Sequence, residues 1–160
     1  MKYPVKNNKS FGQNLCAILP KMFSDFMAYK NFVVPNAEGH AALHKMRISG
    51  KPLRYLMEIK EKRFGKKYIK CAEEIKKIIE LMGEIHDCDV MIPEIIIEIH
   101  DIERRNQLLD EQKKISTHIL IDLAGELHSV RKKMFSELCG KLEEWDKTDF
   151  KSMLKTSMKL

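Results

Sequence analysis

Four side chains that can hold an anion recur at helical spacing between residues 44 and 54. They are His44, Arg47, Lys51 and Arg54. At 100° per residue they fall within an arc of about 80° and along roughly 15 Å of helix axis. The other side of the same helix carries apolar residues, which are Ala42, Met46, Leu53, Leu56 and Met57. We therefore expect an amphipathic helix with one side in a core and one side turned toward something negative.

The chemistry that this basic face offers is electrostatic capture. Arg47 and Arg54 carry planar guanidinium groups that can bond two phosphoryl oxygens at once, whereas Lys51 supplies a mobile point charge. His44 donates a hydrogen bond when it is protonated, and a nearby polyanion favours that form. The segment 44–77 contains 12 Lys and Arg against 4 Asp and Glu, a net charge of +8. Such an excess attracts polyanions, among them polyphosphate, nucleic acid and anionic membranes.

Two features of this helix leave an alternative open. Lys and Arg often occupy a solvated outer helix face, and Glu58 stands four residues after Arg54, where the two can pair. Pro52 removes a backbone hydrogen bond and, with Gly50 nearby, predicts a kink at residues 49–51. A modest kink keeps the four side chains aligned, whereas a full break would scatter them.

The next helix can extend the basic surface. Lys66, Lys70 and Lys77 lie within about 40° on a helical wheel, and we include Lys66 and Lys70 in the candidate site. Glu73 and Glu80 share that side, so a ladder of ion pairs along the helix is the alternative.

Catalytic and metal-binding patterns are weak in this sequence. His40 and His44 have metal-ligand spacing, but Glu38 is the one carboxylate near them in the sequence and no thiol is near, so we predict no metal site. Near His86 we expect Asp87 or Asp89 to cap a following helix and His86 to hydrogen-bond within the bundle. The chain has neither a Gly-rich phosphate loop nor a GxSxG elbow. We predict no catalytic residue and no cofactor.

Helical periodicity runs through the whole chain. Short connections between long helices favour an antiparallel bundle, and we expect one all-α domain over residues 1–160 with about six helices built from helical hairpins. Pro20 should bend or split the first helix, Asn36 should cap the second, and Gly125 is a candidate hinge. The expected helices cover Ser10 to Val33, Asn36 to Arg63, Lys66 to His86, Asp87 or Asp89 to Arg105, Asp110 to Trp145, and a short basic tail after Asp149.

Composition agrees with a cytoplasmic helical protein. Hydrophobic residues make up 44% of the chain, which is enough for a core, while Gly and Pro are too few for an all-β fold. The most apolar run, 90–99, is about half the length of a membrane span, and we see no signal peptide. The four cysteines are far apart and are expected to be buried thiols in a reducing compartment: Cys16, Cys71, Cys88 and Cys139.

Two segments resemble the hallmarks of the CHAD family, the conserved histidine α-helical domains. Residues 44–55 (HKMRISGKPLRY) are similar to its signature helix, a His followed by Arg at +3, basic residues at +7 and +8, and an Arg-Tyr pair. Residues 81–90 (LMGEIHDCDV) are similar to its second motif, Leu-x-Gly-Glu-Leu-His-Asp ending in Asp-Val. The chain departs from the signature at Pro52, where a second basic residue is usual.

The resemblance implies two four-helix halves around a basic channel, binding of inorganic polyphosphate, and association with polyphosphate granules. This chain is shorter than a complete pair of halves, so we expect a trimmed second half. Residues 127–131 (LHSVR) repeat the pattern of residues 43–47 (LHKMR). That echo adds His128, Arg131 and Lys132 to the candidate site, although residues 125–128 (GELH) equally resemble residues 83–86 (GEIH) of the second motif.

The sequence thus predicts a polyphosphate-binding protein that is not an enzyme. A nucleic-acid-binding bundle is the first alternative, although few aromatic residues stand among the cations, Tyr55 and Tyr68 being the candidates for base stacking. A polyphosphate-processing enzyme is the second. It would need a metal-binding carboxylate cluster, and the basic face offers only Glu58.

Overall fold

Apolar side chains at three- and four-residue spacing fold most of the chain into helices. The computed structural model describes residues 3, 5–34, 39–59 and 64–158, and no strand occurs among them. The expected all-α class is confirmed. The helices are α1 (Phe11–Met27), α2 (Lys30–Val33), α3 (His40–Ile59), α4 (Lys66–Asn106), the 3-10 turn η2 (Glu111–Lys113), α5 (His118–Lys147) and α6 (Phe150–Ser157).

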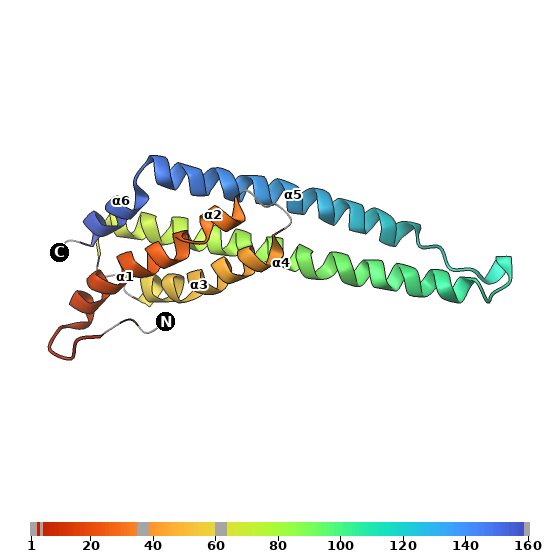
Figure 1. Ribbon diagram of the computed structural model, residues 1–160, viewed down its shortest axis with the longest axis horizontal. Coiled ribbons are helices and arrows are strands. Elements are labelled where there is room, and N and C mark those ends of the chain that lie inside the picture. Colours follow the sequence, from red (N-terminus) through yellow and green to blue (C-terminus); the bar gives the residue numbers. More distant parts are fainter. Residues whose placement is uncertain (1–2, 4, 35–38, 60–63, 159–160) are drawn as a thin grey trace.

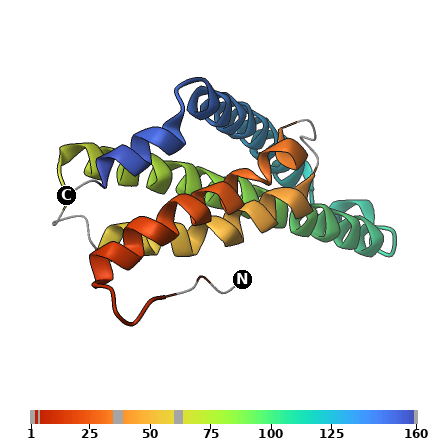
Figure 2. The same ribbon diagram turned by 60° about the vertical axis from the view of Figure 1, so that its left-hand side comes forward.

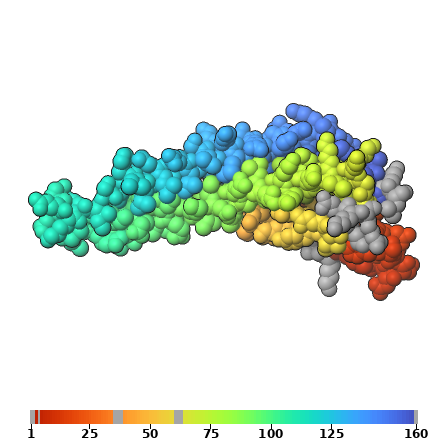
Figure 3. Space-filling model, turned by 180° about the vertical axis from the view of Figure 1, so that it is seen from behind, coloured from red at the N-terminus to blue at the C-terminus, as the bar shows by residue number. Residues whose placement is uncertain are grey.

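The long helices run alternately in opposite directions, as an antiparallel bundle requires (Figure 1). α1 and α3 lie side by side (Figure 2), α3 packs on the first half of α4, and α5 returns along α4. The α4–α5 hairpin continues beyond α1 and α3 as a thinner extension, residues 90–130, which we call the arm (Figures 1 and 3). The remainder is the body. None of the described helices is long and apolar enough to cross a membrane.

The core lies in the body, where α1, α3, α4, α5 and α6 meet. An aromatic cluster joins α1, α5 and α6: the rings of Trp145 and Phe150 stack with centroids 4.4 Å apart, and Phe23 lies 5.7 Å from Trp145. Met46, Leu53 and Met57 are buried, as the amphipathic pattern of α3 predicts. The bundle therefore turns the apolar side of α3 inward.

The expected helix boundary near Asp87 and Asp89 is wrong, because α4 is one helix of 41 residues. The Asp89 carboxylate pairs with side chains of α3 and α5 instead of capping a helix. Capping contributes only about 1 kcal/mol. The apolar contacts of α4 with α5 continue past this point, and their burial favours a continuous helix. Pro93 lies inside α4 and forgoes the single backbone bond to the carbonyl four residues earlier.

Other boundaries differ by a turn or more. The expected first helix is divided at Ala28 and Tyr29, not at Pro20, which lies inside α1. α5 begins at His118, and it is continuous through Gly125. The side chain of Asn106 closes the preceding loop by bonding both the N–H and the carbonyl of Ile115, at 2.9 and 2.8 Å. The expected ends of the second helix at Asn36 and Arg63 fall outside the described residues.

Gly50 marks the closest approach of three helices and generates a stability prediction. A Cβ atom at Gly50 would stand 2.9 Å from the Phe26 ring and 3.1 Å from Ile79, whereas one at Gly125 would meet nothing within 4 Å. We expect Gly50→Ala to lower the free energy of unfolding by about 1–3 kcal/mol through overpacking. Gly125→Ala should raise it by up to about 1 kcal/mol through helix propensity. Urea titrations followed by circular dichroism measure the free energy of unfolding of both variants. If Gly50→Ala were stabilised as much as Gly125→Ala, the close packing at Gly50 would be contradicted.

Candidate functional site

A shallow groove of about 400 Å³ lies between α3 and α4. α3 is continuous through Pro52, so the full break that would scatter the basic face does not occur. Arg47, Lys51 and Arg54 line the groove from α3. The α4 wall carries three acids, which are Glu80, Glu84 and Asp87. The groove is therefore lined by both signs of charge, with its cations on one helix and its acids on the other.

Arg54 is engaged by two of its acidic neighbours. Its Nε donates to Glu58 at 2.7 Å, and a terminal nitrogen lies 3.1 Å from Glu80. The hydrogen bond to Glu58 is the main reason that the pKa of Arg54 is raised. The pairing with Glu58 confirms the ion pair that the four-residue spacing allows. An anion that reaches Arg54 must compete with both carboxylates.

Arg47 has a donor to spare. Its Nε is buried and has no hydrogen-bond partner among the described residues. The guanidinium passes over Gly83, whose missing side chain leaves room for it: a Cβ there would stand 3.7 Å from the Arg47 Nε. An unpaired buried donor costs free energy, so a shift of the Arg47 side chain that brings Nε to an acceptor supplied by a ligand would be favourable.

His44 lies at the end of this row, outside the groove. Its ring stacks on that of His86 in α4, with centroids 5.2 Å apart. It lines a small hollow beside His40 and Asp89, and a larger one between α1 and α3. His86 Nδ1 does not form the expected hydrogen bond within the bundle, because it is buried without a hydrogen-bond partner in the described part of the chain. The Asp87 carboxylate on the same helix lies 3.6 Å away.

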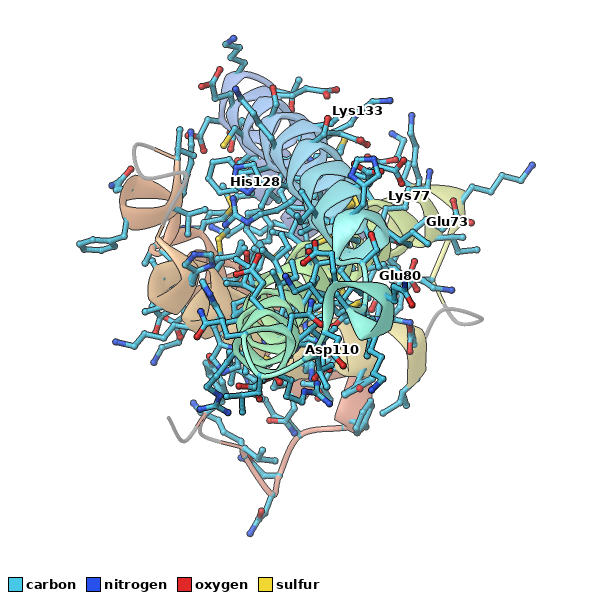
Figure 4. All side chains as sticks on the ribbon, turned by 90° about the vertical axis from the view of Figure 1, so that its right-hand side faces the viewer. Glu73, Lys77, Glu80, Asp110, His128 and Lys133 are labelled. Carbon is cyan, nitrogen blue, oxygen red and sulfur yellow. The ribbon has the colours of Figure 1, made fainter. Side chains whose placement is uncertain are left out.

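The structure does not bring Lys66 and Lys70 into the groove. Both are exposed on the first turns of α4, and neither lines the groove. Lys77 pairs with Glu74 at 3.5 Å, three residues earlier, and Glu80 pairs with Arg54 of α3. Among the described residues, the expected ladder with Glu73 and Glu80 is therefore not formed. Figure 4 shows Glu73, Lys77 and Glu80 on one side of the molecule. These lysines therefore add positive potential at a distance from the α3 cations.

The residues of the sequence echo on α5 have separate environments. His128 and Lys132 are exposed, and Figure 4 places His128 on the side of α5 away from Glu80. Arg131 is buried and forms an ion pair with Asp89 of α4. Its terminal nitrogen lies 3.5 Å from His40 Nδ1, which in turn is 2.8 Å from Asp89. Arg131 is thus placed to join α3, α4 and α5, with its charge already balanced.

Sequence reasoning missed both the Asp89–Arg131 pair and the acidic wall of the groove. The spacing of apolar residues within α4 and α5 does not show which turn of one helix faces which turn of the other. Nothing in the sequence therefore indicated the Asp89–Arg131 pair. The acidic wall had a partial signal in the sequence, because Glu80 shares a helix face with Lys66, Lys70 and Lys77. The stacking of His44 on His86 also depends on which turn of α3 meets which turn of α4.

The groups that line the groove from α3 are mainly hydrogen-bond donors. Among the described residues no group of three or more His, Cys, Asp or Glu could hold a metal ion. All four cysteines are free. Burial raises the pKa of each of these thiols, which disfavours the nucleophilic thiolate. What the groove offers is guanidinium and ammonium groups that can bond anionic oxygens.

These features define an all-helical bundle with a cationic row along α3. The CHAD domain family model matches residues 17–95, which include α3, the groove and most of α1. This part of the chain belongs to the CHAD domain family, which confirms the resemblance of its two motifs. No curated protein and no solved structure matches the chain.

The Asp89–Arg131 pair generates a prediction about stability. Asp89→Asn leaves a buried guanidinium without its carboxylate, and we expect the free energy of unfolding to fall by about 3–5 kcal/mol. Asp101→Asn is the matched control, because Asp101 pairs with Arg104 on the helix surface, and it should cost less than about 1 kcal/mol. Urea unfolding measures both variants. If both variants lost the same free energy of unfolding, the buried pair would contribute no more to stability than the surface pair.

Proposed function

We propose that this protein binds inorganic polyphosphate along the α3–α4 groove, without chemical conversion of the ligand. The observation that carries the proposal is Arg47, which lines a groove within the family-matched segment and whose buried Nε lacks a hydrogen-bond partner in the described part of the chain. Lys51 lines the same groove and is half buried. Together they supply donors that a chain of phosphoryl oxygens can satisfy.

Electrostatics on two length scales supports this ligand. The net charge of residues 1–80 is +10, whereas that of residues 81–160 is −4, so a polyanion is drawn toward the half that holds α3. Within the groove, Arg47 and Lys51 then make direct bonds. His44 stands at the end of the row and can extend the contact. Each phosphate bound releases condensed counterions, which makes the affinity salt-dependent.

The acids of the groove set a limit on affinity and favour a thin ligand. Glu80, Glu84 and Asp87 repel any anion that lies deep against α4. A flexible phosphate chain can follow the α3 side of the groove, whereas a rigid nucleic-acid duplex cannot enter it. A nucleic-acid partner is the alternative. We further propose that the protein acts in the cytoplasm, in association with polyphosphate granules.

Replacing both free groove cations should weaken polyphosphate binding. If about four phosphates are neutralised, the single-strand coefficient of roughly 0.7 per contact gives a log–log salt slope near −3. Arg47→Ala combined with Lys51→Ala should flatten that slope by about one to two units. The measurement is the dissociation constant of a labelled polyphosphate at several salt concentrations.

The control is the double variant of Lys113 and Lys114. These lysines pair with Asp110 and Glu111 at the tip of the arm, and their replacement by Ala should change the slope little. Equal weakening by both double variants would reduce the groove to one patch of a nonspecific cationic surface. Duplex DNA of matched charge should bind less tightly than polyphosphate, and the reverse order would favour the nucleic-acid alternative.

Removing one acid should have the opposite effect. Glu80→Gln frees Arg54 from one of its two carboxylates and deletes a negative charge from the groove wall. We expect polyphosphate to bind several-fold more tightly and the salt slope to steepen by up to about one unit. Glu103→Gln, which removes an acid in the arm, is the control for the change in net charge. An unchanged affinity for Glu80→Gln would place the ligand away from the groove.

A further inference from the structure

The arm exposes far more apolar surface than the body. Eleven of the eighteen exposed large hydrophobic residues in the described part of the chain lie between residues 90 and 130, and Ile102 is the single buried hydrophobic residue there. Some of these side chains are largely open to solvent, such as Ile97 at 56% and Ile119 at 80%. Exposed apolar surface of this extent marks a contact with another molecule.

One stripe of the arm continues a face of α4 that is buried in the body. Ile75, Ile79 and Met82 are buried on the side of α4 that packs on α3, and at Gly50 the two helices approach closely. The same three- and four-residue spacing continues along this face of α4. The next residue is His86, which stacks on His44 of α3, and it is followed by Val90, Pro93 and Ile97. α3 begins at His40, opposite Asp89, so these last three are exposed. We call them the arm stripe.

α3 carries a second exposed stripe on its outer side. Its members recur at three- and four-residue spacing over the whole helix, and all are exposed: Ala41, Lys45, Ile48, Pro52, Tyr55 and Ile59. Lys45, Ile48 and Pro52 also line a hollow of about 690 Å³ that is walled by Met22 of α1 and by Ala28 just after it, and by no residue of α4. The hollow therefore opens on the outer surface of the layer that α1 and α3 form.

We propose that two copies of this chain associate reciprocally, with the arm stripe of each copy packed on the outer α1–α3 surface of the other. The molecule is stepped, because the layer of α1 and α3 covers the body and is absent from the arm (Figures 1 and 3). A twofold rotation brings the thin arm of one copy over the thick body of the next. The same surfaces are then used twice, as in a closed isologous dimer.

Length, area and charge favour a second copy as the occupant. α3 is 20 residues long, about 30 Å, and the arm part of α4 spans about 25 Å. The arm stripe itself covers about 10 Å of this length, from Val90 to Ile97. With the polar residues of the arm included, two contacts of about 25 Å by 10 Å bury on the order of 1,000 Å² over all four surfaces, which is the lower limit for a biological interface. Residues 90–130 have a net charge of −4, whereas Lys45, a cation, is the one charged member of the exposed α3 stripe. Arm against α3 is thus an attractive pairing, whereas arm against arm is repulsive.

Analytical ultracentrifugation of the whole chain tests the dimer directly. At tens of micromolar the wild-type protein should sediment with twice the 18.7 kDa mass of the chain. Ile97→Lys places a cation in the arm stripe, and Ile48→Glu places an acid in the α3 stripe. Each should give a monomer, with a helical circular dichroism spectrum that shows intact folding. Ile119→Lys changes a more exposed side chain, on α5 and outside the arm stripe, and should stay dimeric.

Mixing the two monomeric variants is the sharpest test. A heterodimer of Ile97→Lys with Ile48→Glu retains one undamaged contact, because the unaltered arm of one variant meets the unaltered α3 of the other. Mixing should therefore restore a dimer that neither variant forms alone. A wild-type monomer, a dimer unaffected by Ile48→Glu, or failure of the mixture to associate would overturn the proposal. None of these outcomes depends on polyphosphate binding.

Discussion

Burial of two adjacent sides of α4, one against α3 and the other against α5, is the interaction on which the rest of the structure depends. Ile75, Ile79 and Met82 fill the first contact, and the second continues from Ile85 through Ile102. Because α4 is unbroken over 41 residues, it fixes the direction of both partners. The groove, the histidine stack and the arm all lie along this one helix.

The contact of α3 with α4 also decides the electrostatic character of the site. Packing brings the cations of α3 opposite Glu80, Glu84 and Asp87, so that Arg54 is engaged while Arg47 keeps an unpaired donor. If α3 is considered alone, all four basic side chains are equally accessible to an anion. In the bundle their accessibility differs, because each turn of α3 faces different groups of α4. Affinity for an anion is set by this balance of signs more than by net charge.

The segment that matches the family model ends close to the place where the body of the molecule gives way to the arm. The CHAD model ends at residue 95, just beyond the point where α3 and α1 stop covering α4. In the arm, α4 and α5 pack on each other, and Asp89 and Arg131 close the junction with a buried ion pair. Such a pair favours one register of the two helices, since any slip would leave a buried charge alone. Precise placement of the arm follows from that constraint.

The sequence by itself determined the helical class, the family and the inward side of α3, because each depends on local spacing that a single chain displays. It also placed Met46, Leu53 and Met57 in the core and anticipated the pairing of Arg54 with Glu58. The tertiary structure alone decided that Asp89 binds Arg131 instead of capping a helix, and that Arg131 is balanced while Arg47 retains a free donor. It also decided that an apolar stripe beyond Val90 lacks a cover. These outcomes depend on which turns of separate helices face each other, and local periodicity carries no information about that register.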